Sequence, residues 1–512
     1  IKNMKLKTVK IKNFRGYRHE TSTDFGNLTT FVGKNDIGKS TLLEALDIFF
    51  NDAKACVKID KEDVNIYSSA DDDNEIIISA SFTSLPNTVV IDTTNTTTLE
   101  SEYLLNDNGY LEVVKKYKNT GKPKTYIRAF HPTNANCSDL LLRTNACLKD
   151  IVESNNIECE DKTKNAILRK AIWEYYNASL ELQLIEIDVT RGDTKSIWDK
   201  LQTYLPIYTL FQSDRKNSDG DNEVQDPLKE AVKEILSDEK IQDTFRCITE
   251  EVTQKLSEVS NRTLEKLREM SQDTANTLEP LIPEFSSLKW GDVFKNVSIT
   301  GDQNIPINKR GSGVKRLILL NFFRAEAERR LEVLNASNVI YAIEEPETSQ
   351  HSDNQKKLID AFIDLSNVPN TQIVLTTHSA NIVKKLDISH LRLITISGTS
   401  KVIECVSKGQ LPYTSLNEVN YLAFNEISEE YHNELYGYIE EQGILKVFKQ
   451  NKPTQPYNRV RGGSKVTEQK ILTEYIRHQI HHPENQLNKR YTESELASSI
   501  ELMRDFIDNK QN

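Results

Sequence analysis

Cysteine, methionine and tryptophan are scarce in this sequence of 512 residues, which contains 6 Cys, 3 Met and 3 Trp. The cysteines, at positions 56, 137, 147, 159, 247 and 405, are never closer than ten residues, so CxxC metal knuckles and thioredoxin-like pairs are excluded. We therefore expect free, reduced thiols.

Proline, glycine and long apolar runs are also limited. With 14 Pro, 18 Gly and 37% hydrophobic residues, the composition excludes collagen-like, mucin-like and wholly disordered proteins. No stretch approaches the roughly 18 uninterrupted apolar residues of a membrane helix, and the basic N-terminal residues include no signal-peptide apolar region. We expect a folded, cytoplasmic protein without a membrane partner, and its length favours two domains or one domain with a large insertion.

An overall excess of positive charge is absent as well. The 65 Lys and Arg residues against 76 Asp and Glu give a net charge of −11, so the molecule as a whole repels nucleic acid. The range 446–490 differs, because it holds ten Lys or Arg against three Glu. This local patch is where DNA, RNA or a protein partner is expected to bind.

A glycine-containing loop joins an apolar strand to an amphipathic helix near the N-terminus. The loop, Gly33-Lys34-Asn35-Asp36-Ile37-Gly38-Lys39-Ser40-Thr41, fits GxxxxGK[ST] and follows the apolar run 28–32. Its glycines let the backbone wrap phosphates, and its amides and the helix N-terminus offer partial positive charge. We expect Lys39 to reach the outer phosphates of ATP and Ser40 to bind Mg²⁺.

Acidic residues end a second apolar run. Glu344 and Glu345 follow residues 339–343, at the carboxyl edge of a strand where α/β sheets bind ligands. We expect Glu344 to hold Mg²⁺ and Glu345 to orient or deprotonate the attacking water. His378 follows the next strand and would donate a hydrogen bond to the γ-phosphate, although such a His taken alone is more often structural.

A second glycine-containing turn, Gly311-Ser312-Gly313, opens an apolar helix. The amides around Ser312 and Gly313 form a second anion site. Because the chain already has one phosphate loop, we expect Ser312 and Gly313 of one chain to face the loop 33–41 of another. The alternative is a simple capped helix.

The order IKNFRGY, GKNDIGKST, RGSGVKRL, IEEPE and TTHS resembles the ABC-type ATPase head shared by SMC, RecF and OLD proteins, over roughly 1–135 and 295–400. By that resemblance, Arg15 and Asn35 also lie near phosphate, Ser312 and Gly313 form the signature, and Glu344 replaces the usual Asp of the Walker B motif. No Gln occurs between Ser40 and Gln183, so the Q-loop of this family has no candidate there, which leaves open whether ATP is hydrolysed or only bound.

The fold implied is α/β, an ABC-type ATPase head with a helical insertion and a helical C-terminal domain. The expected parts are an ATPase N-lobe with the phosphate loop (1–136), a helical insertion (137–294), a C-lobe with signature, Walker B and His motifs (295–405), and a helical, basic C-terminal region for partner binding (406–512). Within the N-lobe, the alternation of Leu6, Val9 and Ile11 is that of an edge strand.

The segment PIYTLFQSDRKNSDGDNEVQDPL and the tail resemble the PtuA family of ATPases from Septu and certain retron antiphage systems. Other defence ATPases, of the PARIS type, are similar through the head. The PtuA resemblance implies a head-to-head homodimer or larger homo-oligomer that carries an HNH-type nuclease, PtuB. Chain length excludes long SMC arms, and no Toprim acid pattern follows residue 405.

The tail contains one further candidate site. Residues 470–482 have helical spacing that Pro483 should end, and Arg477 and His482 match the Rx4H spacing of HEPN ribonucleases. His478 and His482 have the spacing of a metal-binding pair but no acidic third ligand. The alternatives are a patch for a nuclease partner or nucleic acid, a packed helical tail, and a catalytic RNase.

Three functions therefore remain open. The chain is an ATPase whose dimer regulates a PtuB-like nuclease in phage defence, an ATP-binding scaffold or sensor with little hydrolysis, or a defence ATPase with a C-terminal RNase.

Overall fold

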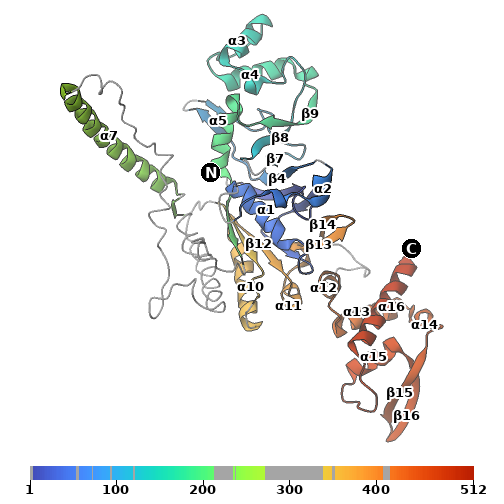
Figure 1. Cartoon of the computed structure of the whole chain (residues 1–512). Coiled ribbons are helices and arrows are strands. Elements are labelled where there is room, and N and C mark those ends of the chain that lie inside the picture. Colours follow the sequence, from blue (N-terminus) through green and yellow to red (C-terminus); the bar gives the residue numbers. More distant parts are fainter. Residues whose placement is uncertain are drawn as a thin grey trace.

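The computed structural model describes residues 4–52, 57–71, 73–92, 95–118, 122–212, 235–236, 238–270, 338–348, 352–406 and 415–511. Two six-stranded sheets form the body of the protein, and a unit of helices with a two-stranded hairpin follows at the C-terminus (Figure 1). The fold is therefore mixed α/β.

The first sheet is antiparallel, with the strand order β2-β1-β4-β7-β8-β9. Its strands are β1 (Lys5–Lys12), β2 (Thr21–Asp24), β4 (Glu75–Thr83), β7 (Leu111–Lys118), β8 (Lys124–Pro132) and β9 (Leu182–Asp188). Strand β1 pairs with β2 on one side and β4 on the other, so the prediction of an edge strand is wrong. The alternation of β1 reflects a sheet with one face on the core rather than an edge position.

The second sheet has the order β10-β11-β12-β3-β13-β14, and its first five strands are parallel to their neighbours. The bounds are β3 (Leu28–Val32), β10 (Ile207–Phe211), β11 (Val339–Glu344), β12 (Thr371–Thr377), β13 (Leu391–Ser397) and β14 (Ser400–Cys405). Strands β3, β11 and β12 read as near-continuous apolar runs because both faces of this sheet are covered.

Helix α1 (Lys39–Asn51) lies between the two sheets (Figure 1). Its buried residues, including Leu42, Leu46 and Phe49, join one core with Phe31 of the parallel sheet and Ile78 of the antiparallel sheet. The phosphate loop therefore precedes a helix that is held on two sides.

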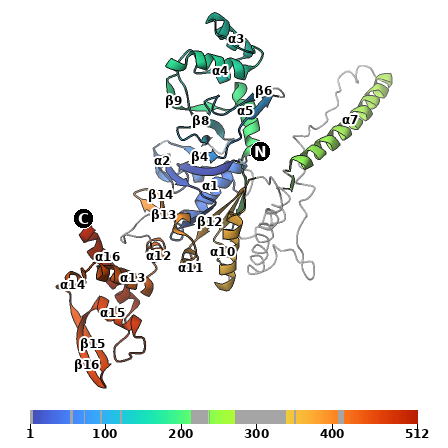
Figure 2. The same cartoon turned by 180° about the vertical axis from the view of Figure 1, so that it is seen from behind.

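The opposite face of the parallel sheet has a second core. Helices α10 (Ser352–Ser366), α11 (Ala380–Val383) and α12 (Leu416–Phe424) cover this face, as the view from behind shows (Figure 2). Val32 and Leu375 point to this side, whereas Phe31 and Val374 point to the α1 side, as the two-residue period of strands requires.

The range 137–294 contributes both helices and strands. Its described elements include α3 (Asn145–Ser154), α4 (Asn165–Tyr175), α5 (Gly192–Leu201) and α7 (Glu239–Met270). The prediction of a purely helical insertion is incomplete, because β9 extends the antiparallel sheet and β10 pairs with β11 in the parallel sheet. A five-residue strand has too few residues to show its period beside long helices.

Smaller elements complete the body. These are α2 (Ile66–Ala70), the strand pair β5 (Val89–Asp92) and β6 (Asn95–Thr97), and the 3₁₀ turns Lys61–Asp63, Leu140–Leu142, Asn177–Ser179, Gln202–Tyr204 and Ile388–His390. Across the part of the chain that is described, no helix is long and apolar enough to cross a membrane.

The C-terminal unit has its own core. Helices α13 (Glu429–Glu441), α14 (Leu445–Phe448), α15 (Leu472–His481) and α16 (Glu493–Gln511) pack around Leu435, Ile476 and Ile500. The prediction of a helical C-terminal region is confirmed by these helices, but it did not include the antiparallel hairpin of β15 (Thr454–Arg461) and β16 (Ser464–Ile471). Gly462 and Gly463, with φ of 56° and 81°, make its two-residue turn, which glycine adopts without steric cost.

Candidate functional site

The parallel sheet brings the sequence motifs to one edge. Strands β3, β11 and β12 are parallel, and their carboxyl ends carry the loop from Gly33, the pair Glu344 and Glu345, and His378. Glu344 is in register with Thr376, and Val32 is in register with Thr377. The shared edge is where α/β sheets bind ligands.

The loop before α1 depends on its glycines. Gly33 has φ of 153° and Gly38 has φ of 105°. A Cβ on Gly33 would lie 3.1 Å from the carbonyl oxygen of Ile394, so a side chain there would collide with backbone. Both glycines therefore adopt a tight, left-handed path that other residues rarely take.

Lys39 is buried within this loop. Its Nζ donates hydrogen bonds of 2.9 Å to the carbonyl oxygens of Gly33 and Lys34 and lies 3.9 Å from Glu345 Oε1. Burial lowers the pKa of the Lys39 ammonium, while the carboxylates of Glu345 and Glu347 oppose that shift. The ammonium is thus held on the inner side of the loop, next to an acid.

The next residue of the loop contacts the acid pair directly. The Ser40 hydroxyl donates a hydrogen bond to Oε1 of Glu344 at the end of β11. These two side chains are the expected Mg²⁺ ligands. Mg²⁺ in nucleotide sites usually takes one or two protein oxygens together with phosphate oxygens and water, so this pair has the right chemistry.

Glu345 has an unusual backbone conformation. Its φ is 41°, in the left-handed region that residues with a Cβ adopt only at a cost. Its amide donates hydrogen bonds of 3.1 Å to the carbonyl oxygen and to the hydroxyl of Thr376, which hold this conformation. His378 Nδ1 lies 3.2 Å from Oε2 of Glu345, so the predicted pair of catalytic residues is in contact.

Glu347 positions the end of the neighbouring strand. It is 4% exposed, and its Oε1 accepts hydrogen bonds from the Thr377 hydroxyl at 2.6 Å and the His378 amide at 2.9 Å. Glu347 therefore fixes the backbone that carries His378. The sequence motif IEEPE contained this residue, but its spacing alone gave it no role.

These side chains surround one cavity of about 470 Å³. It is lined by Asn35, Asp36, Gly38, Lys39, Ser40, Thr41, Glu344, Glu345 and His378. Three carboxylates thus face a single lysine, which would repel a polyphosphate unless a divalent cation accompanied it. The residues present therefore fit a nucleotide with Mg²⁺, in a cavity of the size usual for small-molecule sites.

Arg15 lies outside that lining. Its Nε is 2.7 Å from Oδ1 of Asp63, and its Nη1 contacts Glu44 on α1. Two carboxylates therefore pair with the guanidinium, and the contact of Arg15 with phosphate stays a prediction. Ser312 and Gly313, the predicted signature, lie outside the described residues.

Gln212 lies near the candidate site, although it is not among the residues that line the cavity. It follows β10, and because Phe211 pairs with Ile343, it is level with Glu344 on the adjacent strand. Its Nε2 donates a 3.2 Å hydrogen bond to Glu44 Oε1. Gln212 lies outside the range between Ser40 and Gln183 in which the sequence has no Q-loop candidate, and the polar end of the apolar run 207–211 was the signal that could have pointed to it.

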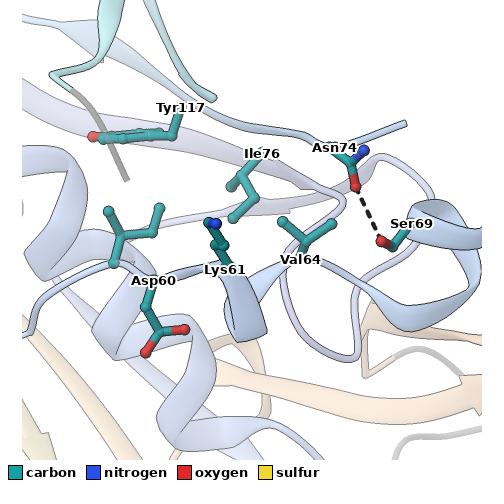
Figure 3. A pocket seen from close by; sticks show the side chains of 8 residues that line it. Asp60, Lys61, Val64, Ser69, Asn74, Ile76 and Tyr117 are labelled. Carbon is teal, nitrogen blue, oxygen red and sulfur yellow. Dashed lines mark hydrogen bonds between the residues drawn. The ribbon is translucent and has the colours of Figure 1, made fainter. Parts of the chain in front are cut away.

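A second cavity, of about 270 Å³, lies beside α2 and the antiparallel sheet (Figure 3). Tyr117 and Ile76 line its wall, and a 3.0 Å hydrogen bond joins Ser69 to Asn74 at one side. None of the loop or acid-pair residues lines it, so it is not a candidate for the nucleotide site.

The structure separates the residues of the proposed RNase pair. The Arg477 guanidinium lies 4.0 Å from the centre of the Tyr436 ring and pairs with Glu440 at 3.1 Å. His482 instead lies beside Glu484, at 3.2 Å, in a cavity that Arg477 does not line. Among the residues that can be described, no group of three or more His, Cys, Asp or Glu could hold a metal ion. His478 and His482 are therefore not part of such a group in this part of the chain.

Comparison with known families identifies the domain. The profile described as "AAA ATPase domain" matches residues 4–383. The chain belongs to this family. The AAA ATPase domain includes the phosphate loop, the acid pair and His378, while the C-terminal unit lies beyond it.

One curated relative is similar over a long alignment. The endonuclease GajA of Bacillus cereus (strain HuB5-5) is 24% identical over 415 residues, which cover 74% of this chain and 56% of the relative. The chain thus spans little more than half of the length of GajA.

Solved SMC heads also resemble this AAA ATPase domain. The SMC head domain from Thermotoga maritima has a TM-score of 0.31 at 12% identity and covers 79% of this chain and 100% of its own. An Smc head domain derived from Pyrococcus furiosus, with an extended coiled coil and bound to the C-terminal domain of ScpA, has a TM-score of 0.38 at 11% identity, with coverages of 78% and 96%.

Proposed function

We propose that the chain is an ABC-type ATPase that binds ATP with Mg²⁺, works as a head-to-head homodimer or larger homo-oligomer, and regulates an associated nuclease in antiphage defence. The observation that carries the nucleotide part is the single cavity that gathers Lys39, Ser40, Glu344, Glu345 and His378.

The first step is the binding of ATP by the loop. Loop amides and the N-terminal end of α1 receive the phosphates, and Lys39 exchanges its carbonyl acceptors for phosphate oxygens. The ammonium therefore has hydrogen-bond acceptors before and after ATP binds: first the two carbonyl oxygens of the loop and then the phosphate oxygens.

The metal ligands are next to the phosphate positions. Ser40 and Glu344 would hold Mg²⁺, which supplies charge neutralisation at the β- and γ-phosphates when it is bound. The Ser40 hydroxyl and the Glu344 carboxylate, which contact each other in the structure, would both serve as its protein ligands.

Hydrolysis needs a water in line with the γ-phosphate. Glu345 is the residue placed to accept a proton from that water, since its carboxylate lies between Lys39 and His378. His378 is held by Glu347 through its own backbone amide and can donate to the γ-phosphate. The φ of Glu345 is strained, and such strain is common at active sites, where the direction of a side chain is needed for the reaction.

The dimer is proposed from the two anion sites in the sequence and from the open side of the cavity. Residues 34–36 at the crest of the loop are exposed. A second chain would supply Ser312 and Gly313 to this side and close the cavity over the γ-phosphate.

The proposed link to a nuclease and to antiphage defence rests on similarity to GajA and to the PtuA family. GajA is an endonuclease, and the alignment with this chain covers 56% of its length. The resemblance to the PtuA family provides the alternative that a separate HNH-type nuclease, like PtuB, does the cutting.

A second candidate is an ATP-binding sensor with little hydrolysis. Its support is the absence of a Gln between Ser40 and Gln183, whereas Glu345 and His378, the residues proposed for hydrolysis, lie together in the cavity. We therefore place turnover first.

The test is steady-state phosphate release together with ATP retention. We expect Glu345→Gln to lower phosphate release roughly 100-fold or more while ATP stays bound. Glu404→Gln, which changes an exposed acid on β14, is the matched control. Equal, background release by the unaltered chain and Glu345→Gln, with tight ATP binding, would establish the sensor instead.

Defence is tested by plaque formation on cells that express the chain with its flanking genes. Lys39→Ala and Glu345→Gln should both lose protection. Full protection by both variants would refute the proposed regulation.

A further inference from the structure

The C-terminal unit contains a cavity of about 640 Å³ that the ATPase domain does not use. It lies between β15, the end of α15 and the loop that follows α15. Figures 1 and 2 both show the β15–β16 hairpin at the end of this unit, apart from the two large sheets.

Three rings form a stack along one wall of this cavity. The Tyr457 ring lies 5.1 Å from the His478 ring at 27°, and His478 lies 6.4 Å from the His482 ring at 20°. Tyr457, at the inner end, is 2% exposed, whereas the His482 side chain, at the outer end, is 56% exposed. The stack is therefore closed on one side and open on the other, where another planar ring can be added.

Apolar side chains flank the open end. Val460 is 63% exposed and Leu487 is 45% exposed, and both line the cavity. Apolar side chains of this kind can pack against the face of a base, which every base has, so the contact does not require a particular sequence.

Cations lie along the same hairpin. The Arg459 Nε is buried without a hydrogen-bond partner, while its Nη2 pairs with Glu468. Arg461 is two residues further along β15, on the same face as Arg459, whereas Lys465 pairs with Val460 and lies on the other face of the hairpin. Arg461 and Lys465 are exposed and have no acidic partner within the described ranges.

Rings open to stacking together with adjacent cations are the two features of a site for unpaired nucleotides. A duplex hides the faces of its bases, so it would use the cations and leave the ring stack without a function. A chain with a net charge of −11 also needs such a local basic patch to approach any nucleic acid.

We propose that this cavity binds single-stranded nucleic acid, with an unpaired base stacked on His482 and neighbouring phosphates bound by Arg459 and Arg461. This inference does not rest on the proposed ATPase function, because every residue involved lies in the C-terminal unit, beyond residues 4–383 of the AAA ATPase domain.

The test uses the full-length chain and fluorescein-labelled twelve-nucleotide probes of dT, of rU and of a duplex, with binding followed by fluorescence anisotropy at 50–200 mM NaCl. His482→Ala should weaken single-strand binding by roughly tenfold, and His482→Tyr should keep it within about twofold, because a tyrosine ring also stacks. His481→Ala is the matched control, since His481 is an exposed neighbour on α15 that does not line the cavity.

The phosphate contacts have their own readout. Arg461→Gln should reduce the slope of log K against log salt by about 0.7, the value for one phosphate of a single strand. Lys446→Gln, which removes an exposed charge on α14, should leave that slope within error of the unaltered chain.

Several results would overturn the proposal. These are no single-strand binding at 50 mM NaCl, equal affinity for the duplex, or equal losses in His481→Ala and His482→Ala. Loss of nuclease association in His482→Ala without any oligonucleotide binding would assign the cavity to a protein partner instead. A preference for dT or for rU supports the proposal and identifies DNA or RNA as the ligand.

Discussion

The Ser40 hydroxyl in the first turn of α1 donates a hydrogen bond to the Glu344 carboxylate at the end of β11, 304 residues later in the chain. The contact exists because β3 and β11 are both parallel strands of one sheet, with β12 between them. The contact brings together the Ser40 and Glu344 oxygens, which are the expected protein ligands of a divalent cation. Substitution of either residue tests its own contribution.

Magnesium dependence should be the first consequence. Glu344→Gln removes the negative charge but keeps the size of the side chain, so we expect the Mg²⁺ concentration for half-maximal ATP binding to rise roughly tenfold. Titration of ATP binding with Mg²⁺ measures this, and EDTA should lower the ATP affinity of the unaltered chain. An unchanged Mg²⁺ requirement in Glu344→Gln would remove this residue from the metal site.

Lys39→Ala should weaken ATP binding by roughly 100-fold, because a buried ammonium that donates to phosphate is lost. Lys34→Ala is the control, since Lys34 is an exposed lysine of the same loop that contributes only its carbonyl oxygen. Isothermal titration calorimetry gives both affinities. Similar affinities for the two variants would contradict the placement of the phosphates.

Gln212→Ala tests a residue that the sequence pattern missed. We expect turnover to fall by about tenfold with little change in ATP affinity, since Gln212 contacts Glu44 of α1 and lies level with Glu344 without lining the loop. Gln202→Ala, at an exposed position before β10, is the control for phosphate release. A large loss of ATP affinity would instead indicate that Gln212 only supports the fold of the loop.

Acid should loosen the C-terminal unit through His432. Burial on α13 lowers the pKa of His432 to about 4, so folding favours its neutral form. The unfolded chain, with a pKa near 6.5, binds more protons in this window, and stability is therefore lost as pH falls from about 6.5 toward 4. The full effect is about 3 kcal/mol.

Hydrogen exchange of the α13 amides at pH 7 and pH 5 measures this loss of stability. His432→Leu should flatten the pH dependence, because Ser499 keeps a hydrogen bond to Thr473 when the imidazole is removed. His482→Ala, which changes another exposed imidazole in the same unit, should keep the dependence of the unaltered chain. An equally steep pH dependence in His432→Leu would assign the effect to other groups.

The sequence predicted the centre of the fold because its signals were local. The apolar runs 28–32 and 339–343, each ending in polar residues, indicated buried parallel strands, and the shared edge then followed from sheet geometry. Contact between Lys39, Glu345 and His378 was therefore predictable before any coordinates.

Other features were decided by contacts that no local pattern contains. Arg15 has the residue type of a phosphate ligand, but no local pattern shows its pairing with Glu44 and Asp63. Strand β10 was hidden among helical segments because it has only five residues, and Gln212 was missed with it. The hairpin β15–β16 has few apolar residues, so its two-residue period was invisible against a basic tail.

The acceptors of Lys39 have a consequence for kinetics. Because the carbonyl oxygens of Gly33 and Lys34 already satisfy the ammonium, the loop is preorganised, and an arriving nucleotide competes for an existing donor instead of creating one. Little ordering entropy is then lost on association. We therefore expect ADP to be replaced by ATP quickly, because the loop need not refold between cycles.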